Sequence, residues 1–277
     1  MVKMGNVWDR TAEFLSDNIG AVLSIALVAF FVPASIEGNF AAAGAGAGAG
    51  LKLLLAALQL GFAVLALWGS LAITAMALDT AAPEGAGRAA LRRLPAALLV
   101  SIVTILGALL LASPILIMLV AAGYDFTAMQ RMEGMELGRL PVTAIALYGI
   151  ALLIVLIWLA ARLVVTTPVI VRERRMLGAL AQSWRLTRGY ALRIVGVLIL
   201  YVVVAWVAHL AASTVFGSIF ALVAGGDGEG VTLAGVLTSI VVAAVQTAFS
   251  VLMPAFTAKL YLALIAEAGL RASAKPA

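Results

Sequence analysis

The sequence alternates between long apolar runs and short polar segments. A helix that crosses the hydrocarbon core of a bilayer needs about 20 mostly apolar residues. Six runs meet this requirement, and they cover residues 19–36, 51–78, 94–122, 141–171, 191–224 and 231–266. The pattern predicts an all-α fold, a polytopic transmembrane bundle that forms one integral membrane domain over residues 1–277. Prolines inside these runs remove backbone hydrogen bonds, so kinks are expected at Pro114, Pro168 and Pro254.

Composition supports a membrane environment and excludes several kinds of site. Apolar residue types make up 64% of the chain and charged types only 11%, whereas a soluble domain usually carries about 25% charged residues. The chain has no cysteine and a single histidine, His209. It therefore offers no thiolate or multi-histidine metal site and no disulfide framework. We expect no metal, no cofactor and no catalytic residues.

Positive charges are distributed unevenly between the connections. Of the 18 lysines and arginines, 13 lie in the two terminal segments and in the second and fourth connections, whereas Lys52, Arg131 and Arg139 lie on the opposite side. Loops rich in lysine and arginine stay in the cytoplasm. This asymmetry predicts a multi-pass protein of the bacterial inner membrane with both termini in the cytoplasm, which an even number of spans also requires.

Three segments that end the even-numbered spans resemble one another. Aligning Thr74, Thr167 and Thr257 superimposes the segments Leu71–Gly85, Leu163–Gly178 and Pro254–Gly269. The first two are each followed by a basic amphipathic stretch and then by another span. The pattern predicts a bundle built from repeated helical hairpins, with cytoplasmic amphipathic helices between them.

The second basic stretch, residues 172–189, has the clearest amphipathic pattern. Leu177, Leu180, Ala181 and Trp184 recur at helical spacing and would form one apolar face. A helix of this kind lies in the membrane interface, with its arginines near lipid phosphates. Three interpretations of its basic residues stay open: topology determinants, recognition of a phosphate-bearing lipid, or docking of a partner protein.

Arg162 is a charged residue inside an apolar run. It can extend to the membrane surface, pair with an acidic residue such as Glu173, Asp79 or Glu267, or contact a lipid phosphate. Together with Arg185 and Arg188, it forms the candidate phosphate-binding site. Lys259 is expected to extend to the surface in the same way.

Two glutamines and the single histidine lie within the spans. Gln59 and Gln246 are expected to hydrogen-bond between helices, because an unpaired amide is costly in lipid. His209 is expected to make an interhelical contact as well. A proton-coupled role for His209 is disfavoured by the lack of a carboxylate in the core of the spans.

The stretch ARLVVTTPVIVRERRMLGALAQSWRLTRGYALRIVG, which begins at Ala161, resembles the glycerophosphoryl diester phosphodiesterase membrane-domain family. The segments Phe14–Pro33 and Pro254–Leu264 fit the same pattern, and Ser183–Gly189 is its most specific part. The resemblance implies a stand-alone membrane domain. It implies no phosphodiesterase activity, because that activity belongs to a separate soluble barrel, which these residues do not include.

These observations favour a non-enzymatic integral membrane protein that interacts with lipids or acts as a scaffold in membrane and envelope homeostasis. The expected partners are membrane lipids, anionic or phosphate-bearing, and a membrane protein or a second copy of the chain. Nucleic acid is not expected as a partner. The alternative is a transporter or permease-like protein that moves a lipid or a small amphipathic molecule.

The charge asymmetry predicts the outcome of a topology experiment. Reporter fusions at Gly46, Gly134 and Gly228 should report the periplasm, and fusions at Gly87 and Gly178 the cytoplasm. Activity of any one reporter on the wrong side would contradict the six-span arrangement.

Overall fold

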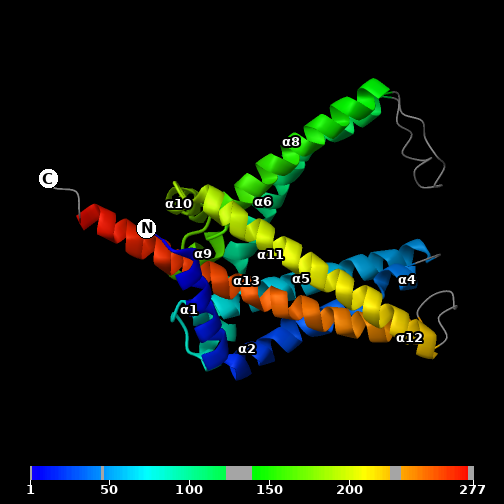
Figure 1. The fold of residues 1–277 in the computed structure, drawn as a ribbon, viewed down its shortest axis with the longest axis horizontal. Coiled ribbons are helices and arrows are strands. Elements are labelled where there is room, and N and C mark those ends of the chain that lie inside the picture. Colours follow the sequence, from blue (N-terminus) through cyan, green and yellow to red (C-terminus); the bar gives the residue numbers. More distant parts are fainter. Residues whose placement is uncertain (1, 45–46, 123–138, 225–231, 274–277) are drawn as a thin grey trace.

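The computed structural model describes residues 2–44, 47–122, 139–224 and 232–273. All regular structure within these ranges is helical, and six segments are long and apolar enough to cross a membrane (Figure 1). Numbered in chain order, spans 1 to 6 are Ile19–Glu37, Ala49–Ala77, Pro83–Ala121, Val142–Glu173, Ala191–Val223 and Leu233–Leu270. The predicted all-α polytopic bundle is confirmed, and the protein is a multi-pass integral membrane protein.

Several spans consist of more than one helical element. Span 1 comprises α2 (Ile19–Ala26), the π-helical turn η1 (Leu27–Phe31) and α3 (Val32–Glu37), and span 2 is α5 (Ala49–Ala77). Span 3 comprises the short η2 (Pro83–Gly85) and α6 (Ala86–Ala121), and span 4 comprises α8 (Arg139–Leu163) and α9 (Thr166–Glu173). Span 5 comprises α11 (Ala191–Ala211), the π-helical turn η3 (Ala212–Phe216) and α12 (Gly217–Ala224), and span 6 is α13 (Leu233–Ser273). The shorter helices outside the spans are α1 (Met4–Asp17), α4 (Phe40–Gly44) and α10 (Gly178–Leu186).

Two local features distinguish the spans from uninterrupted helices with separate interfacial helices between them. The first basic stretch does not form a separate interfacial helix, because it continues directly into the span as the first turns of α6. Span 4 is interrupted between Leu163 and Thr166, just before Pro168. The ring of Pro168 would clash with the carbonyl of Val164, four residues earlier in a continuous helix, which explains a break at this place.

The buried core lies at one end of the bundle. It is formed mainly by the three segments that resemble one another in sequence: residues 71–78 of α5, 165–171 around α9 and 255–264 of α13 contain most of its buried side chains. The α1 helix packs there as well, with the rings of Trp8 and Phe256 separated by 4.4 Å between centroids. We call this the core end of the bundle. The opposite end, where α3, α4 and α12 lie in Figure 1, is the open end.

Small residues let the spans approach closely near the core. Gly69 of α5 lies so close to Ala29 of span 1 that a Cβ atom at position 69 would collide with the Ala29 Cβ. At the open end, Gly38 makes a similar approach to Ser239 of α13, and the Asn39 amide nitrogen donates a hydrogen bond of 2.9 Å to the Ser239 hydroxyl. Spans 1, 2 and 6 are therefore held by close backbone contact, as is usual for helices in lipid.

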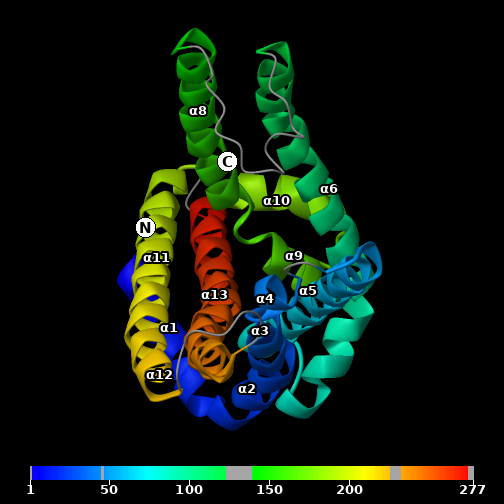
Figure 2. The ribbon, with the colours of Figure 1, turned by 90° about the vertical axis from the view of Figure 1, so that its right-hand side faces the viewer.

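Consecutive spans form three helical hairpins, which are spans 1 and 2, spans 3 and 4, and spans 5 and 6. These hairpins diverge from the core end toward the open end (Figure 1). Figure 2 shows the hairpin of α6 and α8 standing apart from the other two. Residues 102–121 of α6 and 142–160 of α8 include no buried residue. A hydrogen bond of 2.6 Å, donated by the Tyr148 hydroxyl to the Leu111 carbonyl, joins these two stretches. The outer part of this hairpin therefore contributes little to the packing of the bundle.

The close approach at Gly69 predicts the effect of adding one methyl group. Gly69→Ala should lower the stability of the protein by about 1–3 kcal/mol, because the Ala29 Cβ is fixed to the backbone and cannot rotate away. The measurement is the midpoint of thermal unfolding in detergent, followed by size-exclusion chromatography.

The matched control is Gly61→Ala in the same helix, where an added Cβ would meet nothing within 4 Å. This change should be neutral or stabilising, because alanine favours helix over glycine by up to about 1 kcal/mol. Equal midpoints for the two variants would contradict the packing described for Gly69.

Candidate functional site

The α10 helix forms at the core end because its sequence provides both a helical stretch and a stop. Residues 178–186 are helical, and Gly189 then adopts a φ of +89°, a conformation that favours glycine. Tyr190 follows as the N-cap of α11. The predicted helix over Met176–Arg188 is therefore present but shorter, and it is separated from span 5 at the expected glycine.

The two faces of α10 have different surroundings. Ala179, Ser183 and Thr187 are fully buried against the rest of the protein. The predicted apolar face points the other way: Leu177 is 50% exposed, Trp184 is 37% exposed, Ala181 is exposed and Leu180 is half-buried. The face proposed to contact lipid is thus available, while small and hydroxyl-bearing residues attach the helix to the bundle.

Two hydroxyl groups of α10 bond to a single carbonyl group. Ser183 Oγ donates a hydrogen bond of 2.8 Å to the carbonyl oxygen of Arg162, and Thr187 Oγ1 donates one of 3.2 Å to the same atom. The last carbonyls of a helix have no partner within the helix. The serine and threonine of the SWRLTRG stretch therefore complete the C-terminal end of α8, which explains their spacing of four residues.

The Arg162 side chain lies between two indole rings. Its guanidinium carbon is 5.2 Å from the centre of the Trp158 ring and 5.0 Å from that of Trp184. The Nη1 atom also lies 3.5 Å from the Trp184 carbonyl oxygen, while Nε is buried without a hydrogen-bond partner. Arg162 thus joins α8 to α10 through cation–π contacts, which sequence reasoning missed because it considered only carboxylate partners.

Glu173, one of the expected partners of Arg162, has other contacts. It forms an ion pair of 3.2 Å with Arg175 and accepts a hydrogen bond of 2.9 Å from the buried Tyr261 hydroxyl. Lys259, expected to reach the membrane surface, lies with its Nζ 5.0 Å from the centre of the Phe14 ring. The Glu173–Tyr261 hydrogen bond connects α9 to α13, and the Lys259–Phe14 contact connects α13 to α1, both at the core end.

Arg185 and Arg188 are both exposed, and neither has a described contact with Arg162. The structure brings Arg162 together with Trp184 rather than with the other two arginines. Recognition of a lipid phosphate by these three residues stays a prediction.

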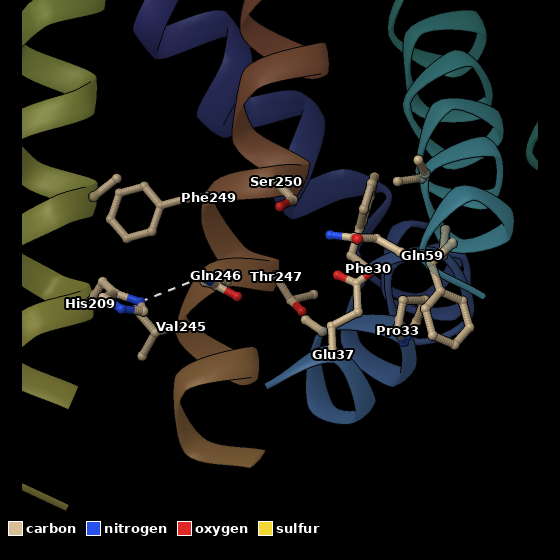
Figure 3. Close-up of a pocket in the computed structure, with 16 residues that line it drawn as sticks. Phe30, Pro33, Glu37, Gln59, His209, Val245, Gln246, Thr247, Phe249 and Ser250 are labelled. Atoms are coloured by element: carbon tan, nitrogen blue, oxygen red, sulfur yellow. Dashed lines mark hydrogen bonds between the residues drawn. The ribbon is translucent and has the colours of Figure 1, made fainter. Parts of the chain in front are cut away.

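A second candidate site lies toward the open end, in a cavity of about 540 Å³ between spans 1, 2, 5 and 6. Figure 3 shows His209 of α11 on one side, Gln59 of α5 on the other, Gln246 of α13 between them, and Glu37 at the end of α3 pointing into the same space. A neighbouring cavity of about 610 Å³ shares Glu37, His209 and Gln246 with the first. We call the two together the open-end cavity.

The polar residues of this cavity lie at one depth. Glu37, Gln59 and His209 are each 18 residues from the core-end limit of their own span. At 1.5 Å per residue they lie about 27 Å along the helices from the core end. Gln59 and His209 also lie 10 and 14 residues from the open-end limits of their spans, so the cavity lies within the spans rather than at their ends.

Both π-helical turns of the protein's described residues border the open-end cavity. Phe30 of η1 lines it, and so does Ser213 of η3. Such turns are rare and occur often at functional sites. Pro33 lies two residues after the end of η1, and its missing donor and bulky ring account for the altered hydrogen bonding there.

Sequence reasoning identified part of this site. The expected interhelical contact is confirmed for Gln246, whose Nε2 lies 3.5 Å from His209 Nδ1. Sequence reasoning looked for a carboxylate in the core of the spans, whereas Glu37, at the end of span 1, lines the same cavity as His209. Glu37 was missed because it lies one residue beyond the apolar run, and no periodicity relates it to a histidine 172 positions later.

No protein-family model matches the chain, and neither does any curated protein or solved structure. The resemblance to the glycerophosphoryl diester phosphodiesterase membrane-domain family therefore stays a prediction.

The hydroxyl contacts of α10 lead to a mutational prediction. The double change Ser183→Ala and Thr187→Val should destabilise the protein by about 1–3 kcal/mol, because it leaves the Arg162 carbonyl without these donors. It should also loosen α10, which a spin label on Ala181→Cys can report, since the chain has no native cysteine.

The control is Ser113→Ala with Thr104→Val in α6, where each hydroxyl donates only within its own helix. This pair should leave both the unfolding midpoint and the mobility of the label unchanged. A label at position 181 that is equally immobile in the Ser183/Thr187 variant would contradict the attachment described here.

Proposed function

We propose that the protein is a non-enzymatic, lipid-interacting protein of the bacterial inner membrane, with both termini in the cytoplasm. In this proposal it holds an amphipathic molecule from the membrane in the open-end cavity. The observation that carries the proposal is that the bundle is not sealed. A cavity of about 540 Å³, lined by apolar residues and by the polar side chains of Glu37, Gln59, His209 and Gln246, adjoins another of about 610 Å³ within the membrane-spanning region.

An apolar groove next to the cavity supports an amphipathic ligand. The groove has a volume of about 780 Å³, runs between spans 1, 2 and 3, and shares Phe62 with the polar cavity. Its lining residues are apolar except for the indole nitrogen of Trp68, which donates a hydrogen bond to the Gly87 carbonyl. A ligand with a polar headgroup in the cavity and an acyl chain in the groove would match both surfaces.

The position of the cavity supports a ligand taken from the membrane. Its lining residues belong to spans 1, 2, 5 and 6, so the cavity lies within the region of the protein that membrane lipids surround. A purely structural scaffold would not need polar side chains from four spans to line a space of this size, because unpaired polar groups in lipid are costly.

Transport is less well supported. A cavity that reached Arg162 would favour movement of a lipid between the two ends of the bundle. Arg162 instead lies between Trp158 and Trp184 at the core end, and it lines neither part of the open-end cavity. Tight packing at the core end separates the two regions, so we favour lipid binding.

Filling the cavity tests the proposal. Ala205 of α11 lines the cavity one helical turn from His209, so Ala205→Phe would place a ring inside it. Overpacking of about 1–3 kcal/mol should weaken lipid binding roughly tenfold or more. The measurement is native mass spectrometry of gently purified protein, with the co-purified lipids identified.

The matched control is Ala151→Phe on the exposed surface of α8. This variant adds the same ring in the second hairpin, away from spans 1, 2, 5 and 6, and should retain lipid as the wild type does. Equal lipid retention by the Ala205 and Ala151 variants would rule out the cavity as the binding site.

A further inference from the structure

We propose that the open-end cavity selects ligands that carry an ammonium group, and that the Glu37 carboxylate binds this group. The inference deepens the proposed function, because it rests on the cavity being a lipid-binding site. It assigns to that site a class of headgroup different from the anionic, phosphate-bearing lipids expected at the basic core end.

The charge of the cavity favours a cation. Glu37 is the acidic residue that lines both of its parts, and no lysine or arginine is among the described residues that line either of them. Within the part of the chain that the structure describes, no side chain donates a hydrogen bond to the Glu37 carboxylate or forms an ion pair with it. The Glu37 carboxylate is partly exposed toward the cavity, so its two acceptor oxygens are available to a cationic donor.

The surrounding groups suit an ammonium ion. A primary ammonium has three donors and no acceptor, so it needs several oxygen atoms around it. Glu37 supplies two carboxylate oxygens, and the amide oxygen of Gln59 faces the same space (Figure 3). Phe30 and Phe62 also line the cavity, and aromatic rings attract cations through their faces.

A divalent metal ion is a poorer match. Such ions usually take several anionic or imidazole ligands, and the described residues contain no group of three or more histidine, aspartate and glutamate side chains that could hold one. One carboxylate balances one ammonium charge. Gln246, His209 and Ser250, on α11 and α13, then provide polar groups for the phosphate of a zwitterionic headgroup.

The ammonium group can come from a membrane lipid such as phosphatidylethanolamine or from a small soluble amine. The experiment uses delipidated full-length protein titrated with dioleoyl phosphatidylethanolamine or dioleoyl phosphatidylglycerol, which share their acyl chains. Binding is measured by native mass spectrometry. Free ethanolamine is added in a third series as a competitor.

Wild-type protein should prefer phosphatidylethanolamine by about tenfold, the ratio that corresponds to about 1.4 kcal/mol. Glu37→Gln should remove most of this preference without lowering binding of phosphatidylglycerol. The control Glu84→Gln, an exposed residue in η2 at the core end, should keep it. Glu37→Asp should retain part of the preference, because it keeps the charge.

Other results would overturn the inference in distinguishable ways. If both lipids bind wild type equally and Ala205→Phe still abolishes their binding, the ammonium preference is wrong while the lipid site stands. If Ala205→Phe lowers the binding of neither lipid, the proposed function fails. If free ethanolamine displaces the lipid at equal concentration, the ammonium preference stands, and the proposed binding of a lipid is wrong because the ligand is a soluble amine.

Discussion

Close packing of small side chains at the ends of three spans holds this protein together. In lipid, helices gain little from hiding apolar surface, so they associate where backbones approach closely and where polar groups find partners. The buried parts of α5 and α13 contain several alanines, and those of α9 contain valine and isoleucine. The hydroxyls of Thr74 and Thr257 bond to carbonyls of their own helices. Most of this packing lies at one end, and the outer parts of spans 3 and 4 include no buried residue.

The core end gains further stability from groups that bridge helices. Ser183 and Thr187 complete the end of α8, and Arg162 lies between two tryptophans. The Tyr261 hydroxyl bonds to Glu173 across the same region. These contacts connect span 4, α10 and span 6, so the basic residues of this end lie on helices that are bonded to one another. The open end has fewer such bridges, and its main one, between Asn39 and Ser239, joins spans 1 and 6.

The sequence was sufficient to predict the spans, because length and apolar character are local properties. The three similar segments that end spans 2, 4 and 6 meet in the core, which their similarity alone did not predict. The sequence was not sufficient for Arg162, whose ring partners are 4 and 22 residues away and carry no charge that would attract attention. The open-end cavity was the hardest to foresee. Its polar residues come from four spans, each contributes one or two, and only the tilt of the helices brings them to one level.

The divergence of the hairpins has a consequence for the surrounding membrane. The cross-section of the protein grows from the core end to the open end (Figure 1). The protein therefore takes up more area in one leaflet than in the other and acts as a wedge among the lipids. A wedge fits best where the leaflet on its wide side is convex. The energy of this protein in a bilayer thus depends on membrane curvature as well as on the lipids that it contacts.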